Sequence, residues 1–502
     1  MESWTIAFVI ILAYLVFMLI IGAWSYLKSK KIAADSTEEY FLMGKNIGPF
    51  LLFWTTLATM QSTFAFLGAT GKFYVEGVGF LVLALSQGVL MSTLTFTVGY
   101  RLWALGKDRN YLTPADFIDD RFRGKDLRML VGFVQAFFTL FYLAMQFVGS
   151  SQAITGVTQG HVSYLTALVL IVIVTGVYTA LGGMRAVVWT DLVQGLILMF
   201  MSIASVLFIV SKLGGVEAIF TKMLQTNPDY FRIPGPANAY TDVKWMMQFL
   251  VLPFGLWLGP QILVRMLAAK DKRSIYASAA AIPISQLWLF GIAAPLLAMA
   301  GYLTYGSNVK APDQIVPMLL ADYLPIVVAA VLLSGAIAAG MSTVDSMILV
   351  ISQIIEKDFV AQFKKVDHKT ALRIGRLTTF LIVLISFLIA YRPPKLLVNI
   401  IIGVTYTAMA QLAPAFILGF YWKRANREGI LTGLVAGLVI LLTTKVLNVN
   451  PLGIPGFLWA FTINWILAMV VSLITKPTPE DVLKQTYERA HQLVYGAKKT
   501  KS

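Results

Sequence analysis

Cysteine is absent from the chain, which excludes disulfides, thiolate-ligated zinc sites and iron–sulfur clusters. Histidine is nearly absent: His161, His368 and His491 are scattered, so we expect no structural metal site. Charged residues are also scarce, at 13% against about 25% in ordinary soluble domains. So few charges cannot cover a soluble protein of 502 residues. Because 58% of the residues are hydrophobic, the composition predicts a membrane protein.

Apolar runs long enough to cross a bilayer follow one another along the whole chain. A transmembrane helix needs about 20 consecutive, mostly apolar residues. The runs are continuously apolar and do not alternate, so helices are favoured over a β-barrel. The sequence therefore predicts an all-α polytopic membrane protein with about thirteen transmembrane helices. Their expected boundaries are 5–26, 48–74, 79–105, 129–156, 163–182, 187–211, 244–267, 275–304, 323–353, 374–391, 396–421, 428–447 and 455–475.

The distribution of Lys and Arg predicts the topology. Basic residues gather in alternate loops, and cytoplasmic loops of membrane proteins are enriched in them. This pattern puts the N-terminus outside the cell and residues 476–502 in the cytoplasm, as a tail beyond a single transmembrane domain of residues 1–475. The expected location is the plasma (inner) membrane. The tail is either a short amphipathic helix or a solvated end.

Several classes of function are disfavoured. The basic loops account for the net charge of +15, so nucleic-acid binding is not expected. No Walker A motif occurs, which argues against an ATP-driven pump. Catalysis in the membrane would need converging acid, base and nucleophile, and His161 is the only histidine near a membrane segment. We therefore expect a transporter, with no cofactor and no enzymatic activity; a channel or a sensor is the alternative.

Two of the predicted helices carry signals of interruption. The middle of helix 48–74 is unusually polar at Thr59–Thr63. Interrupted membrane helices in corresponding positions of two repeats indicate a transport site, because the unwound backbone offers free carbonyl and N–H groups. Polar and small residues can instead simply pack helices together. In helix 244–267 the interrupting residues are Pro253, Gly255, Gly259 and Pro260.

Helix 323–353 carries oxygen donors at its centre. The Ala339 carbonyl and the hydroxyls of Ser342 and Thr343 lie within about one helical turn. Such hard oxygens suit a cation such as sodium, although membrane hydroxyls often bond back to their own helix. Asp191 and Asp345 are the acids expected inside the membrane, where ionisable groups are functional by default. Asp191 could alternatively be a favourable charge at a helix N-terminus.

Three segments resemble one known family. They are YTALGGMRAVVWTDLVQG (Tyr178–Gly195), AAGMSTVDS (Ala338–Ser346) and FYWKRANREGILTG (Phe420–Gly433). Through them the chain resembles the sodium:solute symporter family over nearly its whole length. The resemblance implies a LeuT-type fold, in which helices 2–6 (about 48–211) and helices 7–11 (about 244–421) form two inverted repeats.

The resemblance also implies where the coupling ion binds. The family's main sodium site combines carbonyls at the break in helix 2 with a carbonyl and hydroxyls of helix 9. In this sequence the corresponding residues are Ala58, Gln61, Ala339, Ser342 and Thr343.

A second cation site is implied by some members of the family. Its positions here are Asp191, Ser342, Asp345 and Ser346, and Asp345 replaces a hydroxyl of the family pattern. A second carboxylate either strengthens cation binding or holds a proton, because two close acids rarely both ionise. Sodium is therefore the expected coupling ion, and proton coupling stays open.

The solute is expected between the two broken helices, flanked by helices 4 and 11. Half-helix N-termini that face this region favour carboxylates. Lys72, near the outer end of helix 2, either attracts an anion or snorkels to the surface. The segments YRPPKLL and QLAPAFILGFYWKRANREG resemble the pantothenate and monocarboxylate branches of the family. The candidate lining residues are Thr63, Phe64, Tyr142, Gln146, Trp257, Gln261, Tyr406 and Gln411.

The predicted function is sodium-coupled symport of a small organic anion, such as a monocarboxylate or pantothenate, by alternating access. The alternatives are a proline-like sodium/amino-acid symporter and a proton-coupled carboxylate permease. The expected partners are the solute, sodium ions and the lipid bilayer, and the chain is expected to be monomeric or weakly oligomeric.

Overall fold

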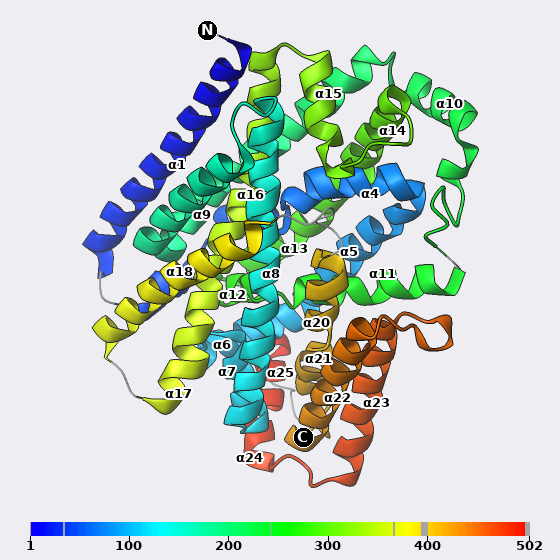
Figure 1. Ribbon diagram of the computed structural model, residues 1–502. Helices are drawn as coiled ribbons and strands as arrows, with labels where there is room; N and C mark the ends of the chain where they lie inside the picture. The colour runs from blue at the N-terminus through cyan, green and yellow to red at the C-terminus, as the bar shows by residue number, and fades with distance from the viewer. Residues whose placement is uncertain (1, 34–35, 241, 365–366, 393–399, 497–502) are drawn as a thin grey trace.

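The computed structural model describes residues 2–33, 36–240, 242–364, 367–392 and 400–496. Within these ranges the fold is all-helical, as predicted (Figure 1). Strand-like pairing is limited there to one isolated parallel bridge between Ile47 and Ala269.

Ten helices of the described residues are long and apolar enough to cross a bilayer, and eleven if one bent pair counts as a single span. The predicted total of thirteen and the predicted sidedness therefore remain predictions. The long uninterrupted helices are α1 (Ser3–Ala33), α8 (Lys125–Val157), α16 (Ile326–Ile354), α18 (His368–Ala390), α22 (Arg427–Val446) and α23 (Gly456–Ile474).

Three further spans are assembled from consecutive helical segments, each with a wider π-turn inside. The first comprises α5 (Leu81–Leu94), η4 (Thr95–Gly99) and α6 (Tyr100–Asp108). The second comprises α13 (Lys272–Gln286), η6 (Leu287–Ala293) and α14 (Ala294–Tyr305). The third comprises η9 (Ile401–Tyr406), α20 (Thr407–Ala410) and α21 (Ala413–Tyr421).

Helix α9 (Tyr164–Lys212) joins two predicted spans, 163–182 and 187–211, through a sharp bend. The bend lies at Gly183, where φ is 58° and ψ is −155°. A Cβ atom at this position would lie 2.6 Å from the carbonyl oxygen of Tyr40. Glycine is thus required twice over, for the positive φ and for the close approach of the neighbouring backbone.

The two helices expected to be interrupted are both broken. Helix α3 (Pro49–Met60) ends before Gln61, and the chain resumes as η2 (Phe64–Gly68) and α4 (Ala69–Glu76).

The second break separates α11 (Asp242–Trp257) from α12 (Pro260–Ala268), and the described parts of the pair are bent by 52°. Pro260 occupies the first turn of α12, where a missing N–H costs nothing, and Gly259 precedes it. Pro253, in contrast, lies inside α11 and does not end it.

A helical cap covers one end of the bundle. It contains α10 (Val216–Thr226) and η5 (Pro228–Phe231), which follow α9, and α10 lies beside α14 (Figure 1). Close by, η7 (Pro312–Gln314) and α15 (Ile315–Tyr323) pack on α4. Gly71 permits this contact, because a Cβ there would lie 2.8 Å from a carboxylate oxygen of Asp313.

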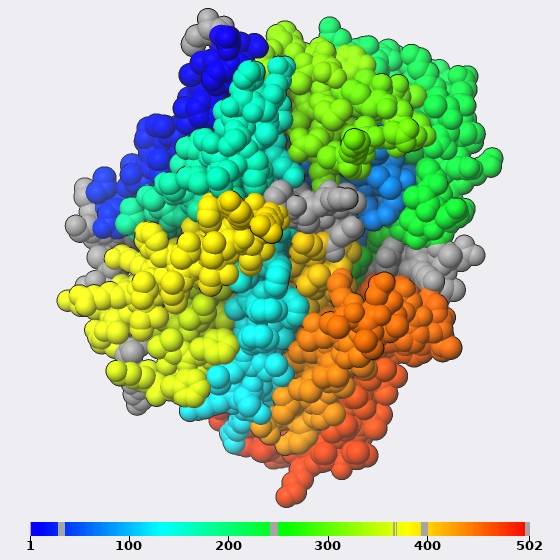
Figure 2. Space-filling view, viewed as in Figure 1, coloured from blue at the N-terminus to red at the C-terminus, as the bar shows by residue number. Residues whose placement is uncertain are grey.

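The outer surface of the bundle is apolar. On α18, which lies at the surface in Figure 2, Leu377, Phe380, Leu384 and Leu388 are each more than half exposed. A contiguous apolar face of this kind would be a liability in water and is expected where a helix contacts lipid.

The tail folds back on the end of the bundle that carries the basic loops. It forms α24 (Glu480–Leu483), η11 (Lys484–Glu488) and α25 (Arg489–Tyr495). Val482, Thr486 and Ala490 recur every four residues and are buried, so one face of this helix is docked. Of the two alternatives for the tail, the structure thus shows the helix.

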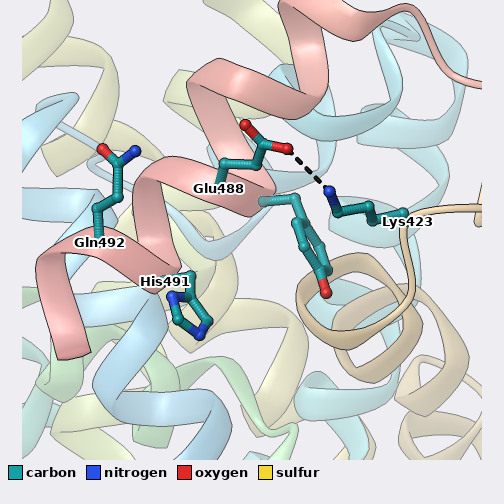
Figure 3. A pocket seen from close by; sticks show the side chains of 5 residues that line it. Lys423, Glu488, His491 and Gln492 are labelled. Carbon is teal, nitrogen blue, oxygen red and sulfur yellow. Dashed lines mark hydrogen bonds and ion pairs between the residues drawn. The ribbon is translucent and has the colours of Figure 1, made fainter. Parts of the chain in front are cut away.

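Charged contacts hold the tail helix in place. Arg489 pairs with Asp108 at the end of α6, at 2.5 Å. Lys423, which follows α21, pairs with Glu488 at 2.9 Å (Figure 3). This pair borders a cavity of about 300 Å³ that His491 and Gln492 also line. The tail therefore connects the ends of two membrane spans that are distant in sequence.

Arg121, on α7 (Pro114–Phe122), is buried beside the tail. Its guanidinium donates to the carbonyl oxygen of Gly419 at 3.0 Å and to the hydroxyl of Thr478 at 3.2 Å. Burial lowers the pKa of Arg121 to about 10. Arg121 thus joins α7 both to α21 and to the segment that leads into the tail.

Candidate functional site

The break in the second membrane segment frees two carbonyl groups. Gln61 is extended, with φ −93° and ψ 99°, so the helical ladder stops at this residue. In an unbroken helix the carbonyl of Thr59 would accept from the N–H of Thr63. That N–H instead donates to Oε1 of Gln146 on α8, at 3.0 Å. The carbonyl of Thr59, and by the same reasoning that of Ala58, is therefore available to other partners.

Hydroxyl groups of α16 face these carbonyls. Ser342 Oγ lies 3.0 Å from the carbonyl oxygen of Ala58, and Thr343 Oγ1 lies 3.3 Å from that of Thr59. Both hydroxyls are also within 3.2 Å of the carbonyl oxygen of Ala339. The backbone of a broken helix and the side chains of an intact one thus converge on a single cluster of oxygen atoms.

The structure brings four of the five predicted main sodium ligands together: Ala58, Ala339, Ser342 and Thr343. The carbonyl of Thr59 joins them, although Thr59 is not among the predicted ligands. For Gln61, the fifth, the structure gives no contact of the carbonyl with this cluster; its side chain is buried, with neither amide atom bonded to a described residue.

Neutral oxygen ligands suit a monovalent cation. Hard cations prefer carbonyl and hydroxyl oxygens, and the hydroxyls can rotate to direct lone pairs at an ion. Over the described part of the chain no group of three His, Cys, Asp or Glu side chains could hold a metal ion. The oxygen cluster is therefore built from the kind of neutral donors that a hard cation accepts.

Three helices meet closely at the break. Thr63 Oγ1 donates to Gln146 Oε1 at 2.8 Å. A Cβ atom on Gly149 of α8 would lie 2.5 Å from Thr63 Oγ1, and one on Gly340 of α16 would lie 1.9 Å from Ser150 Oγ. Only glycine at these two positions lets α8 and α16 approach the break so closely.

A buried arginine lies beside the cluster. Arg265 on α12 pairs with Asp191 on α9, with 2.7 Å between Nη2 and Oδ2, and both side chains are almost completely buried. The same Nη2 atom is 2.6 Å from Ser346 Oγ, and Nε is 3.0 Å from Thr55 Oγ1. Thr55 in turn donates to Asp191 at 2.5 Å. One guanidinium thus connects α3, α9, α12 and α16.

This arginine lies against two residues of the predicted second cation site, Asp191 and Ser346. Asp345, another of its four residues, accepts from Ser346 at 3.2 Å through Oδ1, and its Oδ2 accepts from Tyr178 at 2.9 Å and from Thr190 at 3.2 Å. Arg265 is not among the predicted site residues. The signal available in the sequence is a basic residue inside the span 244–267, where an ionisable side chain is a functional candidate by default.

Several predicted solute-lining residues surround the break in the second segment. Tyr142 on α8 donates to Ser62 Oγ at 3.2 Å, and the hydroxyl of Tyr406 on η9 is 3.4 Å from that of Tyr142. The ring of Phe64 packs edge-on against Phe290 of η6, with the centroids 5.4 Å apart. Aromatic rings and polar side-chain groups therefore gather in one neighbourhood, formed by Thr63, Phe64, Tyr142, Gln146 and Tyr406.

Other predicted lining residues have different partners. The indole N–H of Trp257 donates to Thr95 Oγ1 at 3.0 Å, toward η4. The Oε1 atom of Gln411 accepts from Asn464 of α23 at 3.1 Å. Gln261 stays close to Gly259 and its Oε1 has no partner among the described residues. Gln411 thus contacts α23, and its part in the solute site stays a prediction.

Two buried amides were not expected. Gln87 on α5 and Gln286 on α13 have no hydrogen-bond partner among the described residues for either amide atom. The two helices pack closely at this level, because a Cβ on Gly88 would lie 3.7 Å from Gln286 Cβ. Unpaired buried amides are costly and call for a partner such as water or a solute. The available signal was a lone glutamine in each of two apolar spans.

The comparisons with curated proteins are consistent with this geometry. The chain is 30% identical to a sodium/pantothenate symporter of Haemophilus influenzae, with 86% of this chain and 89% of that protein aligned. It is 27% identical to the osmoregulated proline transporter OpuE of Bacillus subtilis, over 92% of this chain and 94% of that protein. A sodium/pantothenate symporter of Escherichia coli is also 27% identical, with coverages of 88% and 91%.

Solved structures share the fold at low sequence identity. A substrate-bound, outward-open Na+-coupled sialic acid symporter superposes with a TM-score of 0.79 at 19% identity, over 95% of this chain and 99% of that one. Mhp1, a nucleobase-cation-symport-1 family transporter, gives 0.57 at 14% identity, over 93% and 99%.

The family whose description reads "Sodium:solute symporter family" matches residues 40–437, which is well over half of the chain. Its relatives are membrane transporters and not enzymes. On the family match, the similarity to full-length relatives and the oxygen cluster at a broken membrane helix, this chain belongs to the sodium:solute symporter family and is a multi-pass transporter of the cell membrane.

Proposed function

We propose that the chain is a sodium-coupled symporter that imports a small organic anion, of the monocarboxylate or pantothenate kind, by alternating access. The observation that carries the proposal is the contact of Ser342 and Thr343 with the freed carbonyls of Ala58 and Thr59. One cation held there would connect the broken helix to α16.

Coupling follows from the position of that contact. The carbonyls of Ala58 and Thr59 lie directly before the break, and Thr63 and Phe64 lie directly after it. Sodium bound to the oxygen cluster would fix the break in one conformation and so complete the solute site. Because coupling between two binding sites is reciprocal, the solute would raise the affinity for sodium by the same factor. Release of sodium on the inner side would then free the broken helix and weaken the binding of the solute.

We further propose that one sodium ion is transported. The guanidinium of Arg265 already compensates Asp191 and contacts Ser346, which are two of the three additional residues of the predicted second cation site. Two unit positive charges 4 Å apart repel by about 4 kcal/mol at an effective dielectric constant of about 20. A second sodium ion beside the guanidinium would have to overcome repulsion of this order.

The assignment of an organic anion rests on the relatives named above. The pantothenate symporter of Haemophilus influenzae is 30% identical to this chain, and the proline transporter OpuE is 27% identical. Proline-type symport is therefore the second candidate. Proton-coupled carboxylate transport is a third, since Asp345 is a buried carboxyl group close to the cluster.

The test is uptake into proteoliposomes that contain the purified chain. Radiolabelled pantothenate, pyruvate and proline are supplied separately, each with an inward gradient of sodium, of potassium or of protons. The proposal expects accumulation of a carboxylate above its equilibrium level only with the sodium gradient. Accumulation of proline and of neither carboxylate would show that the solute is an amino acid. Accumulation driven by a proton gradient in the absence of sodium would overturn sodium coupling.

A further inference from the structure

A cavity of about 400 Å³ lies beyond the break in the second membrane segment, on the side away from Arg265. It is enclosed by α4, α11, η9 and α22 and by the segment before α11. The predicted topology makes this side the external one. The polar and aromatic lining residues are Lys72, Glu76, Tyr240, Phe249 and Lys445, with the backbone of Gly403.

The lining of this cavity shares two helical segments with the proposed solute neighbourhood. Lys72 follows Phe64 by eight residues, which is about 12 Å along a helix. Gly403 precedes Tyr406 by three residues, which is about one turn. The lining of the cavity therefore comes within about one helical turn of Tyr406 and about two turns of Phe64.

The charges around the cavity are unequal. The carboxylate of Glu76 is already bound by the ammonium group of Lys72 and by the hydroxyl of Tyr240. Lys445, from α22, donates to the carbonyl oxygen of Gly403. Within the described residues Lys445 forms no ion pair with a carboxylate. Among the described lining residues there is therefore an excess of one positive charge, at Lys445, whose ammonium group has hydrogens left to donate.

We propose that this cavity is a reception site for organic carboxylates, in which Lys445 binds the carboxylate group before the solute moves to the broken helices. The inference rests on the proposed transport of an organic anion. A partly enclosed positive charge raises the local concentration of anions and speeds their capture. Such a site acts on the apparent affinity for the solute and not on the translocation step.

A structural role for Lys445 makes a different prediction. If the ammonium group served only to bond the carbonyl of Gly403, either a neutral donor or an arginine would substitute for it, and salt would have little effect. A binding role requires the positive charge, so arginine should substitute and glutamine should not. Lys484, an exposed lysine in the tail at the opposite end of the bundle, provides a control of equal charge.

The experiment measures sodium-driven uptake of pantothenate and of pyruvate by Lys445→Gln, Lys445→Arg, Lys484→Gln and the unsubstituted chain. Ionic strength is varied with choline chloride at constant sodium. We expect Lys445→Gln to raise KM about tenfold with Vmax within about twofold, since one charge-assisted hydrogen bond is lost. Lys445→Arg and Lys484→Gln should keep the original KM.

The unsubstituted chain offers a readout that does not depend on a variant folding. Its KM should rise with ionic strength, and in Lys445→Gln this dependence should be weaker. Sodium-driven carboxylate uptake with the same KM in Lys445→Gln, or a KM of the unsubstituted chain that is insensitive to salt, would overturn the reception site while leaving the proposed function intact. Absence of carboxylate uptake by the unsubstituted chain would overturn both.

Discussion

Arg265 and Asp191 form a buried ion pair, with 2.7 Å between Nη2 and Oδ2, beside the oxygen cluster that is proposed to bind sodium. The pair joins α12 of one broken segment to α9, and its hydrogen bonds reach Thr55 of the other broken segment. One guanidinium therefore connects α3 of one broken segment to α12 of the other.

Arg265→Gln is expected to destabilise the protein strongly. Removal of one partner of a buried ion pair leaves an uncompensated charge and typically costs about 3–5 kcal/mol. Arg265→Gln with Asp191→Asn removes both charges, so the double variant should recover much of the loss. Thermal unfolding in detergent measures the difference; a double variant less stable than the single one would contradict this account of the pair.

The same substitution tests the number of sodium ions. With Asp191 unpaired, a second cation gains a carboxylate ligand and loses its positive neighbour. The sodium dependence of uptake by Arg265→Gln should become sigmoidal, with a Hill coefficient that rises from about 1 toward 2. A coefficient near 2 in the unsubstituted chain would refute transport of a single sodium ion.

Ser342→Ala combined with Thr343→Ala should abolish sodium-stimulated uptake and leave the protein in the membrane. The substitutions remove both side-chain oxygens of the cluster and little volume. Ser334→Ala, on the same helix, is the matched control, because among the described residues its hydroxyl bonds to the carbonyl of Val331 alone. Uptake and the amount of protein in the membrane are measured on the same samples. Uptake by the double variant that still depends on sodium would show that the ion binds elsewhere.

Gly340→Ala should impair both stability and uptake. The added methyl group would lie 1.9 Å from Ser150 Oγ and 2.8 Å from Thr63 Cγ2, and forcing such groups into a packed core costs about 1–3 kcal/mol. Adding Ser150→Ala removes the nearer obstacle and should restore part of the loss. Gly88→Ala has space, with the nearest atom at 3.6 Å, and serves as the tolerated control. Equal melting temperatures for Gly340→Ala and Gly88→Ala would argue against close packing at the break.

The ion pair between Asp108 and Arg489 should help to hold the tail on the bundle. Both side chains are partly exposed, so the contribution of the pair to stability is expected to be small and to weaken in salt. Asp108→Arg should accelerate hydrogen exchange in Arg489–Tyr495, and Asp108→Arg with Arg489→Asp should reverse the effect. Exchange that is unchanged in the single variant would show that the buried face alone holds the tail.

Much of the fold was accessible from the sequence, because lipid imposes a simple rule on length and polarity. The continuous apolar runs predicted an all-helical membrane protein. The polar stretch Thr59–Thr63 predicted one break, and the set of Pro253, Gly255, Gly259 and Pro260 predicted the other, which the structure places at Gly259 and Pro260. The hydroxyls of Ser342 and Thr343 were recognisable for a related reason, since oxygen donors one turn from a carbonyl stand out in an apolar helix. These features are local in sequence and need no knowledge of neighbours.

What the chain determined by itself was therefore where helices run, where they break and which residues carry oxygen donors. Only the tertiary structure decided which partners those donors meet. A membrane helix that is apolar on most faces has no hydrophobic periodicity to show which face points inward. From the sequence, Gln411 could therefore face either the break or α23. In the structure it contacts Asn464 of α23. The pairing of Arg265 with Asp191 joins residues 74 positions apart and depends on how α12 is bent at Gly259. The kinds of side chain and their local spacing can be read from the sequence. Which charged residues pair in the low-dielectric interior depends on how the helices pack together.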